Sequence, residues 1–194
     1  LPVVIFYKNY NFAKNKLKHL AMLKTIKRVS FIIAISVFFT TVSCLTDEEE
    51  IQIVRSPELE ASELYTALSN LEAGGYDIDT TDLGIFYVIH EEGEGPYPVA
   101  GDTCYIEYEG YLLDGIIFDA SSDHYLDGIW ELIYKDIPLI EGFDDGIALM
   151  NKGTEIDIII PSYLAYGAYG AGIIPPYSTI VFSAIMHDLK PQSD

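Results

Sequence analysis

Apolar residues between positions 57 and 75 recur at steps of three and four. This spacing puts four of them on one helical face: Leu64, Ala67, Leu68 and Leu71. Ser56 is positioned to cap the helix, Pro57 suits its first turn, and Gly74-Gly75 ends the pattern. The sequence therefore predicts a short amphipathic helix over residues 57–75. It either packs on its own domain, the commoner outcome at this length, or pairs with a partner helix as a dimer arm.

From Leu83 onward the apolar positions alternate with polar ones, which is the pattern of a β-strand. Four segments follow it: residues 86–90, 104–109, 155–160 and 179–186. In the third segment, Glu155 and Asp157 alternate with isoleucines. We therefore expect one buried and one solvated face, as in an antiparallel sheet.

One helical segment interrupts these strands. Its apolar residues again recur at steps of three and four: Ile140, Phe143, Ile147 and Met150. The segment ends at Asn151-Lys152-Gly153. Strands, one short helix and then further strands indicate an α+β domain whose helix covers one face of the sheet.

Ahead of these elements the chain has the pattern of an export signal. Residues 22–28 are basic in part, residues 29–42 form an apolar run of about 14 residues, and Ser43 precedes Cys44. A membrane-spanning helix needs about 20 apolar residues. A signal peptide over residues 22–43 is therefore favoured over a permanent transmembrane helix.

The segment Thr41-Val42-Ser43-Cys44 resembles a bacterial lipobox, in which the cysteine is acylated and becomes the first residue of the mature protein. Acyl chains on Cys44 would hold the protein on a membrane, because each buried CH₂ contributes about 0.8 kcal/mol. A plain secreted protein is the alternative. Residues 44–56 are acidic and lack apolar periodicity, which predicts a tether. Residues 1–21 precede the first methionine and hold no motif, which indicates either a start site placed too far upstream or an alternative start codon read as Leu1.

Charge is distributed unevenly over the 194 residues. Residues 1–43 carry seven Lys or Arg, whereas residues 44–194 carry four against 30 Asp or Glu, a net charge of −26. Proteins bind nucleic acids mainly through Lys and Arg on phosphates, so this surface excludes nucleic acid and anionic head groups as partners. We expect contact with a membrane only through the lipid anchor. Two cysteines are too few for a disulfide scaffold.

The usual catalytic motifs do not occur in the sequence. There is no zinc-binding H-E-x-x-H, residues 77–82 lack the glycine that a calcium loop requires, and residues 167–172 lack the lysine of a phosphate loop. The absence of these motifs favours a site that works as a binding pocket over one that uses a nucleophile. We expect no metal and no cofactor.

Six motifs, in order and spacing, resemble the FKBP-type peptidyl-prolyl cis-trans isomerases, or rotamases. They are residues 108–115, 118–121, 140–143, 163–167, 173–176 and 179–182. The resemblance covers residues 83–190. It implies an α+β fold in which a twisted antiparallel β-sheet wraps around one short α-helix. A hydrophobic pocket between them would accept a substrate proline.

The resemblance also implies which residues form this pocket. Those with a catalytic role would be Tyr108, Phe118, Asp119, Ile140, Tyr166 and Phe182. Those that bind substrate would be Trp130, Leu139, Phe143, Ile173 and Ile174. In this scheme the N–H of Ile140 anchors the substrate, Tyr166 donates its hydroxyl to a substrate carbonyl, and Asp119 polarises groups near the bond. Phe143 forms the floor.

The function implied is an isomerase that assists the folding of exported proteins. Its partners would be proline-containing polypeptides, and macrolide-type inhibitors would bind the pocket. Together with Cys44, this predicts an outer-membrane lipoprotein on the periplasmic or cell-surface side. One alternative is a non-catalytic FKBP-like chaperone or binding module. Another is a surface protein that binds host or polymeric ligands, which only the acidic run after Cys44 indicates.

Overall fold

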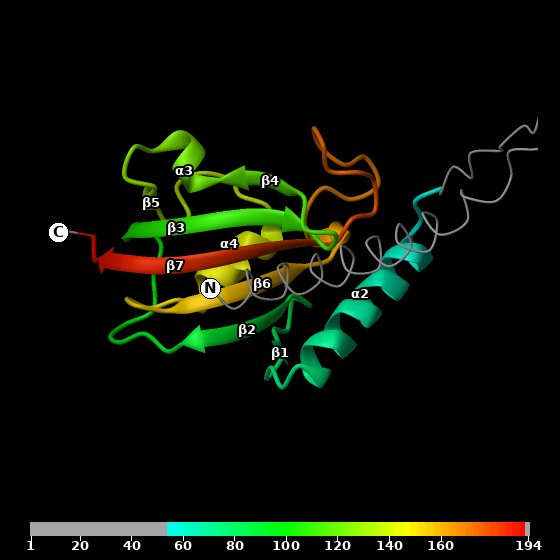
Figure 1. Cartoon of the computed structure of the whole chain (residues 1–194). Coiled ribbons are helices and arrows are strands. Elements are labelled where there is room, and N and C mark those ends of the chain that lie inside the picture. Colours follow the sequence, from blue (N-terminus) through cyan, green and yellow to red (C-terminus); the bar gives the residue numbers. More distant parts are fainter. Residues whose placement is uncertain (1–53, 193–194) are drawn as a thin grey trace, which may run out of the picture. The chain divides into compact units, whose positions relative to one another are not determined.

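The computed structural model describes residues 54–192. These residues form one antiparallel sheet of seven strands, with helices beside it (Figure 1). The elements are, in chain order, α2 (Pro57–Ala73), β1 (Asp79–Thr80), β2 (Phe86–Glu91), β3 (Thr103–Leu112), β4 (Ile117–Ala120), α3 (Ser121–His124), β5 (Trp130–Ile133), α4 (Glu141–Ile147), β6 (Glu155–Ile160), the 3₁₀ helix η1 (Ser162–Leu164) and β7 (Ile180–Lys190). The start site, the signal peptide, Cys44 and most of the tether lie outside the described residues. Within residues 54–192, no helix is long and apolar enough to cross a membrane.

The strand order in the sheet is β1-β2-β6-β7-β3-β4, and β5 also pairs with β3. The longest pairing joins β3 to β7, from Thr103 opposite Lys190 to Leu112 opposite Ile180. The strand that comes last in the chain therefore lies in the middle of the sheet, between β6 and β3. All the pairings are antiparallel. The α+β class and the sheet predicted from the sequence are confirmed.

The four segments with alternating residues form β2, β3, β6 and β7. The solvated face expected for β6 was wrong at Asp157, which is only 5% exposed. Its carboxylate lies 2.8 Å from Nε2 of His90 on the neighbouring strand. A buried carboxylate needs such a partner, because losing its water is costly.

Helix α4 lies against the sheet over β6, and two glycines let the two elements approach closely. A Cβ at Gly142 would collide with Ile160, and one at Gly146 would collide with Ile158. The core between helix and sheet is built from aliphatic side chains that are under 2% exposed, among them Ile106, Ile147, Met150, Ile156, Ile158, Ile160, Ile180 and Met186. This packing fixes α4, and with it one wall of the cavity described below.

The helix predicted over residues 57–75 is α2. Its N-cap is Ser56, whose hydroxyl accepts the backbone N–H of Leu59 at 3.2 Å. Gly74 closes its C-terminal end, and Gly75 takes a positive φ of 86° that suits glycine. The buried residue of α2 is an acid, Glu60, which is 6% exposed.

Candidate active site

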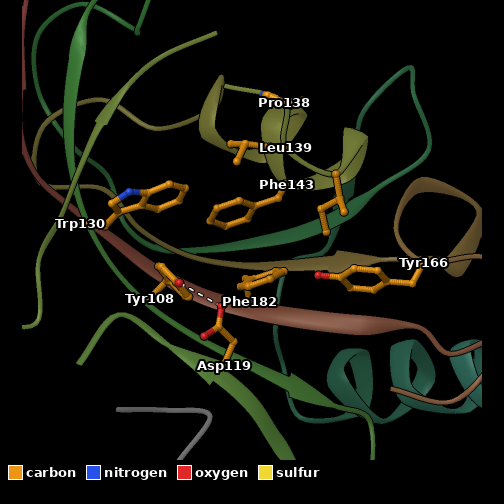
Figure 2. Close-up of a pocket in the computed structure, with 9 residues that line it drawn as sticks. Tyr108, Asp119, Trp130, Pro138, Leu139, Phe143, Tyr166 and Phe182 are labelled. Carbon is orange, nitrogen blue, oxygen red and sulfur yellow. Dashed lines mark hydrogen bonds between the residues drawn. The ribbon is translucent and has the colours of Figure 1, made fainter. Parts of the chain in front are cut away.

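A cavity of about 250 Å³ opens between α4 and the sheet (Figure 2). One side chain comes from each of β3, β4, β5, α4 and β7, three come from the segment before α4, and one comes from the loop after η1. The lining residues are Tyr108, Asp119, Trp130, Pro138, Leu139, Ile140, Phe143, Tyr166 and Phe182. Distant parts of the chain therefore converge on one site.

Aromatic rings form the deep part of the cavity. Phe143 and Phe182 lie with ring centroids 4.3 Å apart, and they are 4% and 5% exposed. The Tyr108 ring meets both edge-on, at 5.9 Å and 5.8 Å, and Trp130 packs against Tyr108 at 5.8 Å. Edge-on contacts of this kind add to the energy of burial and hold the rings in place. The result is an apolar floor with few groups that can bind water.

The carboxylate of Asp119 lies between Tyr108, inside the cavity, and His124, at its solvent-facing rim. Tyr108 donates its hydroxyl to Oδ2 of Asp119 at 3.0 Å, and Nε2 of His124 lies 2.7 Å from Oδ1. Burial, together with this hydrogen bond to the carboxylate, raises the pKa of Tyr108. The Tyr108 phenol therefore stays protonated as a donor at neutral pH.

Tyr166 stands at the opposite end of the cavity, and Figure 2 shows its hydroxyl directed toward Phe182. Burial, with a smaller contribution from the charge of Asp119, raises the pKa of Tyr166. In Figure 2 the dashed line joins Tyr108 to Asp119, and none joins Tyr166 to another residue drawn. The Tyr166 phenol is thus a neutral donor facing the cavity.

The segment before α4 brings a backbone donor to the same cavity. Ile140 is the N-cap of α4, with φ −63° and ψ 139°, and its carbonyl accepts the N–H groups of Phe143 and Asp144 at 3.1 Å. Among the described residues, the N–H of Ile140 has no protein acceptor. A ligand carbonyl in the cavity can therefore take it.

Eight of the eleven residues that the sequence assigned to a pocket line this cavity: Tyr108, Asp119, Trp130, Leu139, Ile140, Phe143, Tyr166 and Phe182. Sequence reasoning missed Pro138, which lines the cavity, and His124, which pairs with Asp119. The position of Pro138 directly before two predicted pocket residues was a usable signal. His124 became relevant only because α3 follows β4 without a loop.

Phe118 is not among the residues that line the cavity, and its role in the pocket stays a prediction. Its ring packs edge-on against Phe182, with centroids 5.5 Å apart and planes at 88°. Gly110 makes room for both rings, since a Cβ there would lie 2.7 Å from Phe118 and 2.8 Å from Phe182. Phe118 therefore supports the Phe182 ring.

Ile173 and Ile174 also lie outside the lining. They belong to a tight turn in which Ala171 and Ile174 exchange backbone hydrogen bonds at 2.8 and 3.0 Å. The turn sends the two side chains to opposite environments: Ile173 is 60% exposed, and Ile174 is 6% exposed and packed in the core. Their roles in substrate binding stay predictions.

The chemistry of the site is that of binding and orientation. Within residues 54–192, no group of three or more His, Cys, Asp or Glu side chains is arranged to hold a metal ion. The cavity offers aromatic faces, two phenol hydroxyls, one carboxylate and one free backbone N–H. These groups suit an apolar ring flanked by peptide carbonyls.

Comparisons with known proteins agree with this geometry. Residues 95–186 match the family model described as FKBP-type peptidyl-prolyl cis-trans isomerase. Over 114 residues the chain is 38% identical to the FKBP-type peptidyl-prolyl cis-trans isomerase FkpA of Escherichia coli K12, covering 59% of this chain and 41% of that protein. It is 35% identical over 123 residues to a probable FKBP-type isomerase of Haemophilus influenzae, covering 63% and 49%. The chain thus spans less than half the length of these relatives.

Two solved structures resemble the fold. The crystal structure of FkpA from Escherichia coli matches with a TM-score of 0.57 and 30% identity, over 70% of this chain and 63% of that one. A peptidyl-prolyl cis-trans isomerase from Pseudomonas syringae matches with a TM-score of 0.58 and 27% identity, over 71% and 98%. The sequence motifs, the fold and these matches lead to the same assignment. The domain that contains the cavity, matched over residues 95–186, is therefore of the FKBP-type peptidyl-prolyl cis-trans isomerase family.

Proposed function

We propose that this chain is a peptidyl-prolyl cis-trans isomerase whose cavity takes the proline ring of a polypeptide client. The observation that carries the proposal is the division within the cavity, where aromatic rings form the floor and hydrogen-bonding groups stand at the rim. The match of residues 95–186 to the isomerase family supports it.

Rotation about an X-Pro bond requires the loss of amide resonance, at a barrier near 20 kcal/mol. It needs no nucleophile, metal or proton transfer. The twisted amide has less charge separation between oxygen and nitrogen than the planar amide. An apolar site therefore disfavours the twisted form less than the planar one, and the rings of Phe143 and Phe182 supply such a site.

The polar groups at the rim orient the substrate. The N–H of Ile140 anchors one substrate carbonyl, and the hydroxyl of Tyr166 binds another. Asp119, held by Tyr108 and His124, polarises groups near the rotating bond. Each hydrogen bond contributes about 0.5–1.5 kcal/mol, a few-fold to roughly tenfold in rate, so no single polar group is indispensable.

The test is an isomerisation assay of the purified chain on an X-Pro peptide, with and without a chelator. We expect acceleration of cis–trans exchange that the chelator leaves unchanged, because the proposed chemistry uses no metal. If the chain accelerates exchange on none of a set of peptides that differ in the residue before proline, the proposal is wrong. Activity that the chelator abolishes also contradicts it.

A non-catalytic chaperone is the second candidate, and exposed apolar side chains favour it. Leu126 follows α3 and is fully exposed, Ile137 is 46% exposed and adjoins Pro138, and Ile173 is 60% exposed. Such side chains can hold an unfolded client. The two functions separate in one experiment: a chaperone without isomerase activity suppresses aggregation of a proline-free client yet leaves the exchange of the X-Pro peptide at its uncatalysed rate.

Export and lipid attachment are a separate part of the proposal and rest on residues 22–44 alone. Acylated Cys44 would tether an outer-membrane lipoprotein that acts on exported clients, in the periplasm or at the cell surface. Changing Cys44→Ala should release the protein from membranes. A variant that stays in the membrane after alkaline extraction indicates an uncleaved helix instead.

A further inference from the structure

A buried carboxylate connects α2 to the domain. Glu60 in the first turn of α2 is 6% exposed and accepts three hydrogen bonds from residues more than 100 positions away. Its Oε1 accepts the backbone N–H of Ser162 at 2.6 Å and the hydroxyl of Thr179 at 2.9 Å. Its Oε2 accepts the hydroxyl of Ser162 at 2.6 Å. Ser162 and Thr179 are themselves 4% and 2% exposed.

A second contact from the same end of α2 reaches the same part of the domain. The guanidinium of Arg55 donates to the carbonyl of Tyr177 at 2.6 Å and to that of Pro176 at 3.3 Å. It also pairs with Glu63 on α2 at 2.8 Å. Tyr177 has a positive φ of 49°, which is uncommon for a residue with a side chain. Arg55 therefore bonds the loop at a residue whose backbone conformation is uncommon.

Both contacts fall at the ends of one segment, residues 162–179, and this segment carries Tyr166. The carbonyl of Ser162 accepts the N–H of Gly167 at 2.8 Å, and the carbonyl of Gly167 accepts the N–H of Tyr177 at 2.9 Å. Gly167, the residue after Tyr166, is thus bonded through its N–H and its carbonyl to the two residues that Glu60 and Arg55 hold. A short chain of hydrogen bonds links α2 to the phenol that faces the cavity.

The chemistry of Glu60 indicates that this contact serves more than packing. A buried carboxylate that meets only neutral donors adds little stability over an apolar side chain of similar volume, whereas it fixes its partners in one geometry. We propose that Glu60 is a positioning residue, which sets the place of Tyr166 in the cavity and so tunes substrate binding. The inference rests on the proposed isomerase function.

The first test compares the kinetics of three variants in the full chain. Changing Glu60→Ala should raise KM about five-fold, which is the effect expected from losing one hydrogen bond to the substrate. It should change kcat less than about two-fold. Changing Glu60→Gln keeps an acceptor oxygen and should restore KM to within about two-fold of the original. Glu72 is exposed on the last turn of α2, so Glu72→Ala is the matched control and should leave both parameters unchanged.

A double-mutant cycle separates positioning from general destabilisation. If Glu60 acts through the phenol, Glu60→Ala combined with Tyr166→Phe should raise KM no further than either change alone, about five-fold. Additive effects, near 25-fold, overturn the inference, and so does an unchanged KM in Glu60→Ala. Should Glu60→Ala fail to fold, Ser162→Ala takes its place, since it removes one of the three bonds to Glu60 and should raise KM about two-fold. Added to Tyr166→Phe, Ser162→Ala should again raise KM no further.

Hydrogen exchange tests the contact between Glu60 and the loop without relying on an activity assay. In Glu60→Gln and Ser162→Ala, the amides of Ala165 and Gly167, both bonded to the carbonyl of Ser162, should exchange faster, by about tenfold in Ser162→Ala. Amides of β7 near Ile185 should keep their original rates. If the original chain proves inactive, this exchange result still decides whether Glu60 holds the loop. Uniformly faster exchange across the domain, or none at Gly167, refutes the inference.

Discussion

The floor and the rim of the cavity differ in how firmly their residues are held. The floor residues Phe143 and Phe182 come from α4 and the central strand β7, and they contact one another and Tyr108. At the rim, the side chains of Asp119 and His124 are 37% and 53% exposed, and Tyr166 lies on a loop. Water competes for rim hydrogen bonds, whereas it is excluded from the floor. We therefore expect activity to depend more on the rings than on any one polar group.

Removing a floor ring should have the largest effect. Phe182→Ala leaves a void beside Phe143 and should lower the unfolding free energy by about 3–5 kcal/mol. Water entering the void should reduce kcat/KM by roughly 100-fold, which corresponds to about 3 kcal/mol. Denaturant unfolding and the isomerisation assay measure the two effects. Phe182→Leu keeps most of the side-chain volume, and it replaces the alanine variant in these measurements if that variant does not fold.

Removing the supporting ring should have the next largest effect. Phe118 packs on Phe182 without lining the cavity, so Phe118→Ala should reduce kcat/KM by roughly 30-fold, through a Phe182 ring that is free to tilt. Tyr65 on α2 is 74% exposed, and Tyr65→Ala is the control for loss of an aromatic side chain elsewhere. A Phe118→Ala variant as active as this control shows that the support is unnecessary.

At the rim, Asp119→Leu should reduce kcat/KM by about tenfold, because Tyr108 and His124 both lose their partner. The pKa of Tyr108 should fall, since the carboxylate no longer raises it. Kinetics and a spectroscopic tyrosine titration measure these outcomes. Asp123→Leu changes an exposed acid on α3 and is the control. An unchanged titration contradicts the role of the hydrogen bond.

Tyr166→Phe should have the smallest effect, about five-fold in kcat/KM, because it removes one hydroxyl and keeps the ring. The same assay on one peptide ranks all four variants, with circular dichroism to confirm folding. If Tyr166→Phe or Asp119→Leu is inactive while Phe118→Ala and Phe182→Leu are nearly normal, catalysis depends on hydrogen bonding or proton transfer. The argument from the apolar floor is then wrong.

The sequence predicted the long elements well and the short ones poorly. Strands β2, β3, β6 and β7 are six residues or longer, so alternation within them is visible. Strands β4 and β5 have four residues each, and β1 has two, which is too short for any period to show. Their positions depend on pairing with distant strands. Periodicity along one segment carries no information about such pairing.

The sequence predicted which residues belong to the site better than it predicted how their side chains are oriented. Motif order identified Phe118 and Ile174, yet it could not show that one ring turns behind Phe182 and the other side chain turns into the core. Nothing in the sequence pattern pointed to Glu60, because an acid in the first turn of a helix usually faces water. Its burial follows from Ser162 and Thr179, whose contact with α2 is purely tertiary.

The place of β7 in the sheet has a consequence for how the domain folds. Its partners β6 and β3 cannot complete their hydrogen bonds until β7 has been synthesised, because β7 lies between them and follows both in the chain. Until then each presents an unpaired edge to other chains. Pairings as distant as Thr103 with Lys190 also slow folding, because a long loop must close first. The nascent domain is therefore itself aggregation-prone until its last strand inserts.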